Sequence, residues 1–395
     1  MQHEFFGISH WRPRLSKHNF VEFTGLAQQA VRLRTKIDSN IAKVLDHGQF
    51  IMGPEVKAFE NRLVEFCGAK HAITCANGTD ALQIALMSKQ IGVGDAVFVP
   101  SFTYTATAEV ILILGAIPVF VEVNSYTFNI DPESLKQSIV RAKAAGLKPS
   151  AVISVDLFGL PADCDVIARI SEEHGLFYIS DAAQSFGAHL GDGRHVGTMA
   201  TVTTTSFFPA KPLGCYGDGG AIFTDDDELA DTMRSIRVHG QGVAKYETVR
   251  LGMNSRLDTL QAAVLDAKLD VFAEETANRN ALADRYSERL SNVVITPTKP
   301  DGVVSAWAQY TIKVPERDGF QAALKTAGIP TAVYYPKPMH LQPAYGHFGN
   351  GPGSMPGSEM LSEQVLSLPM NPYWTSEDVE LVCNAVAHVA QKFSA

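Results

Sequence analysis

Short apolar runs alternate with longer amphipathic stretches through the first half of the chain. The runs have the length of buried strands, and the stretches repeat their apolar positions with helical spacing. This alternation is typical of βαβ units, in which a mostly parallel sheet is covered by helices. The predicted strands are 71–76, 95–100, 117–123, 150–158 and 176–183, and the predicted helices between them are 80–92, 103–115 and 165–175.

The pattern changes near residue 200. Two apolar runs, 201–208 and 219–224, are separated only by a short loop, which favours an antiparallel pair. Further on, the sequence predicts a long helix over about 259–290, followed by a smaller α+β region. In that region strands at 306–314 and 330–336 flank a helix at 318–328, and a last helix covers 376–393.

Length and composition allow a large buried core. The chain has 395 residues, of which 46% are hydrophobic and 19% are charged, and this length suits about two or three domains. We expect an N-terminal tail over 1–19, a large domain over 20–278 and a smaller C-terminal domain over 279–395. In a parallel α/β sheet, ligands collect at the carboxyl ends of the strands, so we expect the site there.

Charge and cysteine usage restrict the possible partners. The formal net charge of −9 argues against a broad electrostatic surface for nucleic acid or for an anionic membrane. The five cysteines form no CxxC pair and no metal-binding spacing with histidine, and their odd number suits a reducing compartment. We therefore expect a cytoplasmic protein with no metal site, in which any anionic ligand is held by a local cluster.

The longest apolar run and the N-terminus are the segments of the sequence that come nearest to membrane or export signals. The run at 108–123 is interrupted by Gly115 and Pro118 and contains Glu109 and Glu122, so it predicts a helix followed by a buried strand. The first 20 residues lack the apolar core of a signal peptide. The sequence therefore predicts neither a membrane span nor secretion.

Two junctions between a strand and a helix carry candidate binding groups. In CANGTDAL (75–82), backbone amides at the start of a helix could hold a phosphate without a basic side chain; simple N-capping by Asn77 or Thr79 is the favoured alternative for this motif alone. In ISDAAQSFG (179–187), Asp181 could pair with a protonated ring nitrogen. Capping of the next helix by Asp181 is an equally good interpretation.

Two further candidate binding features carry basic residues. Lys211 lies in SFFPAKPLGCYGDGGAIFT (206–224), among apolar residues and glycines that leave room for a bulky partner. An amine in such a pocket loses charge stabilisation and becomes a nucleophile toward carbonyls. The segment 234–258 concentrates arginine residues in a chain that is acidic overall, and its glycine spacing makes an anion-binding loop at least as plausible as a solvated face.

A phosphate-binding turn, a carboxylate for a ring nitrogen and a carbonyl-reactive lysine together fit one cofactor. Pyridoxal 5′-phosphate (PLP) carries an aldehyde that forms a Schiff base with lysine, and its pyridinium ring acts as an electron sink. This combination predicts a PLP enzyme in which Lys211 is the Schiff-base lysine.

The chain resembles the DegT/DnrJ/EryC1/StrS family of sugar aminotransferases from about residue 20 to its C-terminus. The resemblance implies the fold type I (aspartate aminotransferase-like) architecture, a homodimer with shared active sites and L-glutamate as amino donor. The matching segments are GQFIMGPEV, ANGTDAL, PSFTYTATAE, DAAQSFGA, SFFPAKPLGCYGDGGAIFT, NSRLDTLQAA and YYPKPMHLQPAY.

The resemblance also implies roles for residues at matching positions. Lys211 would form the Schiff base and carry protons, Asp181 would pair with the pyridine nitrogen, and Gln184 would lie beside the ring hydroxyl. Tyr104 would stack on the pyridine ring. The remaining implied contacts are phosphate binding by Gly78, Thr79 and Ser206, a phosphate contact to the neighbouring subunit's cofactor by Asn254, and substrate binding by Arg256, Tyr335 and His340.

Within the family, the chain is similar to 3-aminotransferases of diacetamido-uronic acid biosynthesis. This implies transfer of an amino group from L-glutamate to the C3 ketone of UDP-2-acetamido-2-deoxy-3-oxo-D-glucuronate, for bacterial surface polysaccharides such as O-antigen lipopolysaccharide. Tyr334 departs from the histidine that relatives often have. Another 3-oxo or 4-oxo deoxysugar nucleotide therefore remains as an alternative substrate. A non-catalytic PLP-binding regulator is a separate alternative, whereas Lys211 argues against the dehydratases of the family, which typically carry histidine there.

Overall fold

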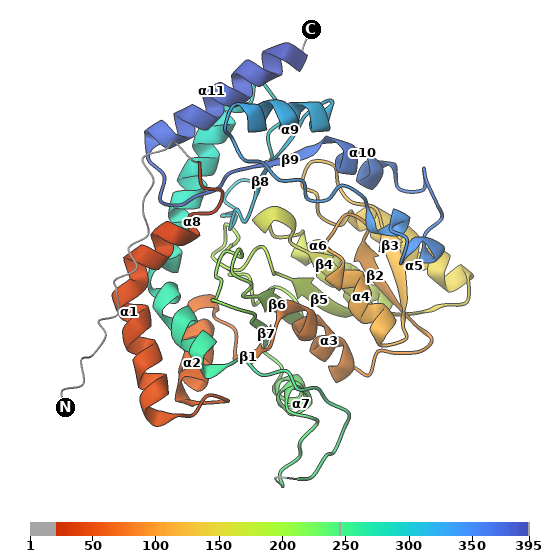
Figure 1. The fold of residues 1–395 in the computed structure, drawn as a ribbon. Coiled ribbons are helices and arrows are strands. Elements are labelled where there is room, and N and C mark those ends of the chain that lie inside the picture. Colours follow the sequence, from red (N-terminus) through yellow and green to blue (C-terminus); the bar gives the residue numbers. More distant parts are fainter. Residues whose placement is uncertain (1–20, 245, 394–395) are drawn as a thin grey trace, which may run out of the picture.

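The computed structural model describes residues 21–244 and 246–393, so the predicted tail over 1–19 lies outside the described residues. A seven-stranded sheet forms the centre of the structure, and a two-stranded sheet lies in the C-terminal part (Figure 1). This is the α/β fold type I architecture that the sequence predicts.

The large sheet is mostly parallel. Its strand order is β1-β7-β6-β5-β4-β2-β3, and the neighbours from β3 to β6 run parallel, while β7 is antiparallel to both β6 and β1. The predicted antiparallel pair around the Lys211 loop is thus confirmed as β6 and β7. The strands are β1 His71–Cys75, β2 Asp95–Pro100, β3 Ile117–Val121, β4 Lys148–Val155, β5 Phe177–Asp181, β6 Val202–Ser206 and β7 Gly220–Thr224.

Helices cover both faces of this sheet, which explains why its strands are apolar without alternation. Val97 and Val99 of β2 pack in one cluster with α3 and α4, whereas Phe98 packs on the other face with α5 and α6. The helices of this part are α1 Leu26–His47, α2 Pro54–Cys67, α3 Gly78–Ser88, α4 Ala106–Ile113, α5 Pro132–Ala144, α6 Cys164–His174, α7 Asp227–Arg237 and α8 Thr259–Leu290.

The C-terminal part packs on the second half of α8. Tyr286 and Leu290 of α8 share a buried cluster with the two-stranded sheet and with helices α9 and α11. The helix α8 is continuous through residue 278, where we divide the two domains, and that division stays a prediction. The elements are β8 Tyr310–Lys313, α9 Arg317–Thr326, α10 Pro356–Gln364, β9 Val365–Leu368 and α11 Ser376–Phe393, with 3-10 turns at Leu157–Gly159, Met339–Leu341 and Gly346–Phe348.

The predicted strand at 330–336 is wrong. Only Ala332 of this segment pairs, through an isolated bridge to Ser367, and β9 is the antiparallel partner of β8. Pro330 and Pro336 have no amide hydrogen to donate to a ladder. Between these two prolines, Tyr334 and Tyr335 line a cavity instead of pairing in a sheet.

None of the helices in the described ranges combines the length and the apolar character needed to cross a bilayer.

A buried ion pair joins three elements beside the sheet. Arg237 at the end of α7 donates from Nη1 to Glu60 Oε1 of α2 at 2.7 Å and to the Thr74 carbonyl of β1 at 2.8 Å. Glu60 Oε1 also accepts from the Thr74 amide at 3.0 Å. The exposed fraction is 6% for the Arg237 side chain and 5% for the Glu60 side chain. Each buried charge is therefore compensated mainly by the other charge rather than by water.

Replacing Glu60 with glutamine leaves the Arg237 guanidinium buried beside a neutral amide. Loss of one partner of a buried pair costs about 3–5 kcal/mol, and we expect the free energy of unfolding of Glu60→Gln to fall by about 3 kcal/mol in urea denaturation. Asp38→Asn is the matched control, because Asp38 pairs with Arg34 on the surface of α1 and should cost less than about 1 kcal/mol. Equal losses in the two variants would contradict a special role for the buried pair.

Candidate active site

A cavity of about 340 Å³ lies at the carboxyl ends of the parallel strands. Val155, Asp181 and Ser206 are the last residues of β4, β5 and β6, and all three line it. The structure therefore confirms the expected edge of the sheet. Of the site residues predicted from the sequence, the cavity brings together Gly78, Thr79, Tyr104, Asp181, Gln184, Ser206, Lys211 and Tyr335.

The turn before α3 contains the N-cap that the sequence offers as one alternative, and it also borders the cavity. Asn77 is the N-cap, and its side chain accepts from the Asp80 amide at 2.8 Å. Gly78 and Thr79, the first two residues of the helix, still line the cavity. Their amides lie at the positive end of the helix dipole, where an anion is favoured.

Two glycines allow this turn to lie directly on the sheet. A Cβ on Gly78 would come within 2.7 Å of Ser206 Cβ, and a Cβ on Gly220 would come within 2.5 Å of the Asn77 carbonyl oxygen. Any larger residue would separate the turn from β6 and β7. The result is a narrow cup formed by the start of α3 and the end of β6, in which Ser206 Oγ accepts from the Phe208 amide at 3.3 Å.

Asp181 lies deep in the cavity. Its Oδ1 accepts from the Ala183 amide at 3.1 Å, and the Thr107 hydroxyl donates to Oδ2 at 3.5 Å. Burial raises the pKa of this carboxyl, whereas its hydrogen bond from Ala183 and the nearby Lys211 amine lower it. A cationic partner at this position would hold the carboxylate in its charged form.

Lys211 lies in a tightly folded loop. Its amide donates to the Phe208 carbonyl at 2.9 Å, and the Cys215 amide donates to the Phe207 carbonyl at 2.8 Å. A Cβ on Gly214 would lie 2.4 Å from the Pro209 carbonyl oxygen, so the loop closes only with glycine there. Burial lowers the pKa of the Lys211 amine, and the Asp181 carboxylate partly opposes this shift.

Aromatic side chains close another side of the cavity. Gln184 Nε2 donates to the Tyr335 hydroxyl at 3.3 Å, and Gln184 Oε1 accepts from the Phe158 amide at 2.6 Å. The rings of Tyr104 and Tyr335 lie 6.1 Å apart. Burial raises the pKa of Tyr335 far above its ordinary value, so its hydroxyl keeps its proton.

Three residues predicted for the site do not line the cavity. Asn254 is exposed and Arg256 is partly buried. They flank Ser255, whose hydroxyl accepts from the Ala76 amide at 3.2 Å, close to the cup at Gly78. His340 is fully buried. Its Nδ1 is hydrogen-bonded to Ser101 Oγ at 2.6 Å and its Nε2 to Glu359 Oε1 at 3.1 Å, so it joins structural segments.

Sequence reasoning missed several cavity residues. Asp218, Phe208 and Gln309 also line the cavity. Asp218 is the acidic residue in the GDGG run after Lys211, and that position in the loop was the available signal. Gln309 precedes β8, far from Lys211 along the chain, and nothing in the local sequence indicates its place.

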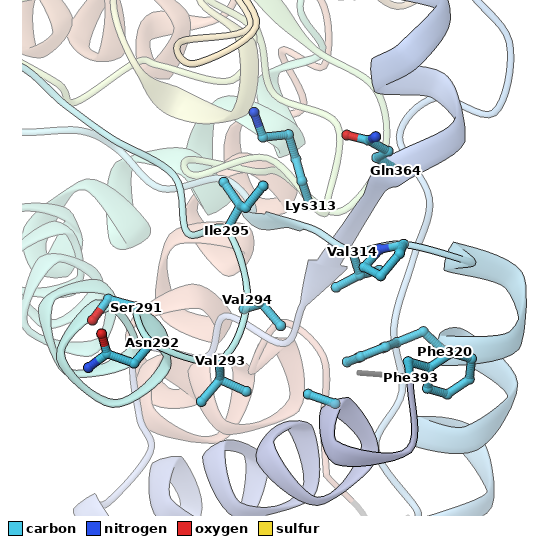
Figure 2. A pocket seen from close by; sticks show the side chains of 12 residues that line it. Ser291, Asn292, Val293, Val294, Ile295, Lys313, Val314, Phe320, Gln364 and Phe393 are labelled. Carbon is cyan, nitrogen blue, oxygen red and sulfur yellow. The ribbon is translucent and has the colours of Figure 1, made fainter. Parts of the chain in front are cut away.

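A larger cavity of about 490 Å³ lies in the C-terminal part, away from these groups (Figure 2). Val293, Val294, Ile295 and Phe320 border it. Among the described residues that line it, Lys313 is the only charged one, and its Nζ donates to the Ser125 carbonyl at 2.8 Å. Size alone would favour this cavity, but the cavity at Lys211 holds the reactive groups.

Comparisons with known proteins identify the family to which the chain is similar. The family model described as "DegT/DnrJ/EryC1/StrS aminotransferase family" matches residues 31–387. A protein of Pseudomonas aeruginosa named UDP-2-acetamido-2-deoxy-3-oxo-D-glucuronate aminotransferase is 47% identical over 369 residues, which are 93% of this chain and 100% of the relative.

Two solved structures extend the comparison. A DegT DnrJ EryC1 StrS aminotransferase from Brucella abortus is 49% identical, with a TM-score of 0.91 over 93% of this chain and 98% of that chain. NtdA from Bacillus subtilis, solved with bound cofactor PMP (pyridoxamine phosphate), is 30% identical, with a TM-score of 0.86 over 95% and 86% of the two chains.

The residues of the cavity fit PLP. The cup at Gly78 and Ser206 excludes side chains and offers helix amides to a phosphate, and the buried Asp181 suits a protonated ring nitrogen. Lys211 has the depressed amine pKa that an imine-forming lysine needs. The chain belongs to the DegT/DnrJ/EryC1/StrS aminotransferase family and is a PLP-dependent enzyme.

Proposed function

We propose that this enzyme transfers an amino group from L-glutamate to the C3 ketone of UDP-2-acetamido-2-deoxy-3-oxo-D-glucuronate. The observation that carries the proposal is the cavity in which Lys211, Asp181 and the phosphate cup converge. The choice of sugar is supported by the relative from Pseudomonas aeruginosa, which the chain matches over that relative's whole length. An amino-sugar nucleotide made in this way suits bacterial surface polysaccharide synthesis.

The cavity residues divide the work of holding the cofactor. Gly78, Thr79 and Ser206 would hold its phosphate, Asp181 would pair with its ring nitrogen, and Tyr104 would cover its ring. Gln184 would lie beside the ring hydroxyl, held by its bonds to Phe158 and Tyr335. When bound, PLP supplies the electron sink that allows a proton to leave the carbon next to the amine.

Lys211 is the proton carrier in this proposal. Its Nζ takes the proton from Cα of glutamate and later returns a proton when the keto-sugar accepts the amino group. General acid–base catalysis is most efficient when the pKa of the group is near the working pH. Burial lowers the Lys211 pKa toward that range.

We also propose that the enzyme is a homodimer with shared active sites. The segment 243–251 presents the exposed side chains of Val243, Tyr246 and Leu251, and a cluster of exposed apolar residues is typical of an interface. Asn254 follows this segment and is exposed. It would reach the phosphate of the neighbouring subunit's cofactor, and Arg256 would contribute to binding the anionic substrate.

We also propose that the enzyme is located in the cytoplasm. All five cysteines are free and buried, which suits a reducing compartment such as the cytoplasm. Another 3-oxo or 4-oxo sugar nucleotide is the alternative substrate. Tyr334 lines the cavity beside Tyr335 and is therefore a residue through which a different sugar could be selected.

Lys211→Ala and Lys211→Arg test the central role. We expect both variants to bind PLP and to lose at least about a thousandfold in turnover, because neither can carry the α-proton at neutral pH. Arginine keeps the positive charge but cannot carry the proton, so Lys211→Arg distinguishes a need for the charge from a need for proton transfer. The measurement is kcat with glutamate and the keto-sugar; turnover near the wild-type value in either variant would refute the assignment.

The rate of PLP uptake by the apoprotein should report the Lys211 pKa. Burial favours the neutral amine, so the midpoint should lie below the ordinary lysine value of 10.5. The Asp181 carboxylate raises this pKa, so Asp181→Asn should move the midpoint to still lower pH. Stopped-flow absorbance of cofactor binding across pH 6–11 measures both; a midpoint that rises in Asp181→Asn would contradict the coupling.

A two-stage assay tests the substrates. Glutamate added to the PLP-loaded enzyme should bleach the visible absorbance band of the cofactor, and the UDP-linked 3-oxo-uronate, made in situ by a dehydrogenase, should restore it. Mass spectrometry should then detect the amino-sugar nucleotide. Bleaching without restoration would retain the aminotransferase and exclude this sugar, whereas absence of bleaching would exclude glutamate and favour a non-catalytic regulator.

A further inference from the structure

A small second cavity borders the Lys211 loop. It has a volume of about 20 Å³ and is lined by the start of α1, by Lys211 and Pro212, and by Arg279 in the middle of α8. A volume of this order holds one water molecule or one ion of similar size. It is too small for an amino acid or a phosphate ester.

Arg279 brings an unsatisfied donor to this cavity. The exposed fraction of the residue is 8%, and within the part of the chain that the structure describes its Nη1 has no hydrogen-bond partner. Its Nη2 lies 3.7 Å from Glu275 Oε2. That carboxylate is already engaged, because Gln29 Nε2 donates to it at 2.9 Å and the Tyr373 hydroxyl also donates to it. A buried N–H without an acceptor is costly, so the geometry calls for an acceptor in the cavity.

The start of α1 adds a second source of positive potential. This helix of 22 residues has Gly25 as its N-cap and no acidic residue in its first turn. Ala27 donates to Glu22 Oε1 at 3.1 Å, but Gly25 has no side chain that could accept from the other first-turn amides. Uncapped amides and the helix dipole both favour a negative charge at this end.

The chain cannot supply the missing acceptor at position 25. Gly25 has φ +76°, and a Cβ there would lie 2.2 Å from Asn371 Oδ1. A capping serine or aspartate would therefore be strained and would clash with Asn371. The position excludes the usual N-cap residues, and Glu22 supplies a carboxylate acceptor only to the Ala27 amide. Within the described residues, Arg279 Nη1 is left without an acceptor.

We propose that this cavity is an anion pocket, formed by Gly25, Leu26, Lys211 and Arg279, which binds one monovalent inorganic anion the size of chloride. The anion accepts from Arg279 Nη1 and neutralises the positive end of α1. The pocket is lined by α1, the Lys211 loop and α8. A bound anion would therefore stabilise the packing of these three segments around Lys211. The proposal does not depend on which sugar the enzyme uses.

Thermal unfolding of the holoenzyme tests the pocket in solution. Sodium chloride is titrated against sodium gluconate at constant ionic strength, because gluconate is too large to enter and screening stays constant. We expect chloride to raise Tm in a saturating manner by about 2 °C. The rise should disappear in Arg279→Met and persist in Arg34→Met, a control in which the lost arginine is exposed on α1 and pairs with Asp38. Equal Tm values of the wild type in the two salts would overturn the proposal.

Bromide gives a test that needs no variant, in case Arg279→Met fails to fold. Crystals of the wild-type holoenzyme grown in sodium bromide should show an anomalous difference peak between Arg279 and the start of α1. A feature with no anomalous signal would mean that water occupies the cavity and would overturn the proposal. A bromide peak without any chloride effect on Tm would mean binding at crystal concentration only, which also contradicts it.

Discussion

The active site depends on keeping a lysine amine and a carboxylate in one buried cavity. Burial pushes the Lys211 amine and the Asp181 carboxyl toward their neutral forms, and each charge partly offsets the shift of the other. In water this coupling would be screened, but in a cavity of low dielectric it is strong. The surrounding structure must therefore exclude water without separating the two groups.

The parallel sheet achieves this by the way its strands end. Asp181 and Ser206 are the last residues of neighbouring parallel strands, and Gly220 begins the antiparallel strand beside them. Because β7 is antiparallel to β6, it begins at the end of the sheet where β6 stops. The loop with Lys211 between them therefore stays at the carboxyl ends of the parallel strands. Because Gly220 has no side chain, the turn at Asn77 and Gly78 can lie on that edge as well. Three stretches of the chain, at 77–78, at 181 and at 206–220, thus meet at one small volume.

Most of this arrangement could be predicted, because its signals are local. Strand-length apolar runs, the Asn-Gly-Thr turn, Asp181 at a strand end and Lys211 among glycines are each visible within about ten residues of sequence. The structure of the C-terminal part is less well indicated by the local sequence. The segment 330–336 has the composition of a strand, yet β9 takes its place beside β8. His340 is hydrogen-bonded through both ring nitrogens, to Ser101 and Glu359, which its local motif does not indicate; its role as a substrate contact stays a prediction. Such outcomes depend on long-range partners that no local pattern contains.

The same long-range contacts explain how the C-terminal part takes part in the site. Gln184 accepts from the Phe158 amide in the large-sheet region and donates to Tyr335 in the C-terminal region. His340 ties the turn after Tyr335 to Ser101, the residue that follows β2. The first bond holds Tyr335 itself and the second holds the turn at His340 that follows, so contacts with the large-sheet region position the tyrosines that line the cavity. Through its bond to Ser101, the buried His340 therefore helps to determine where Tyr334 and Tyr335 lie.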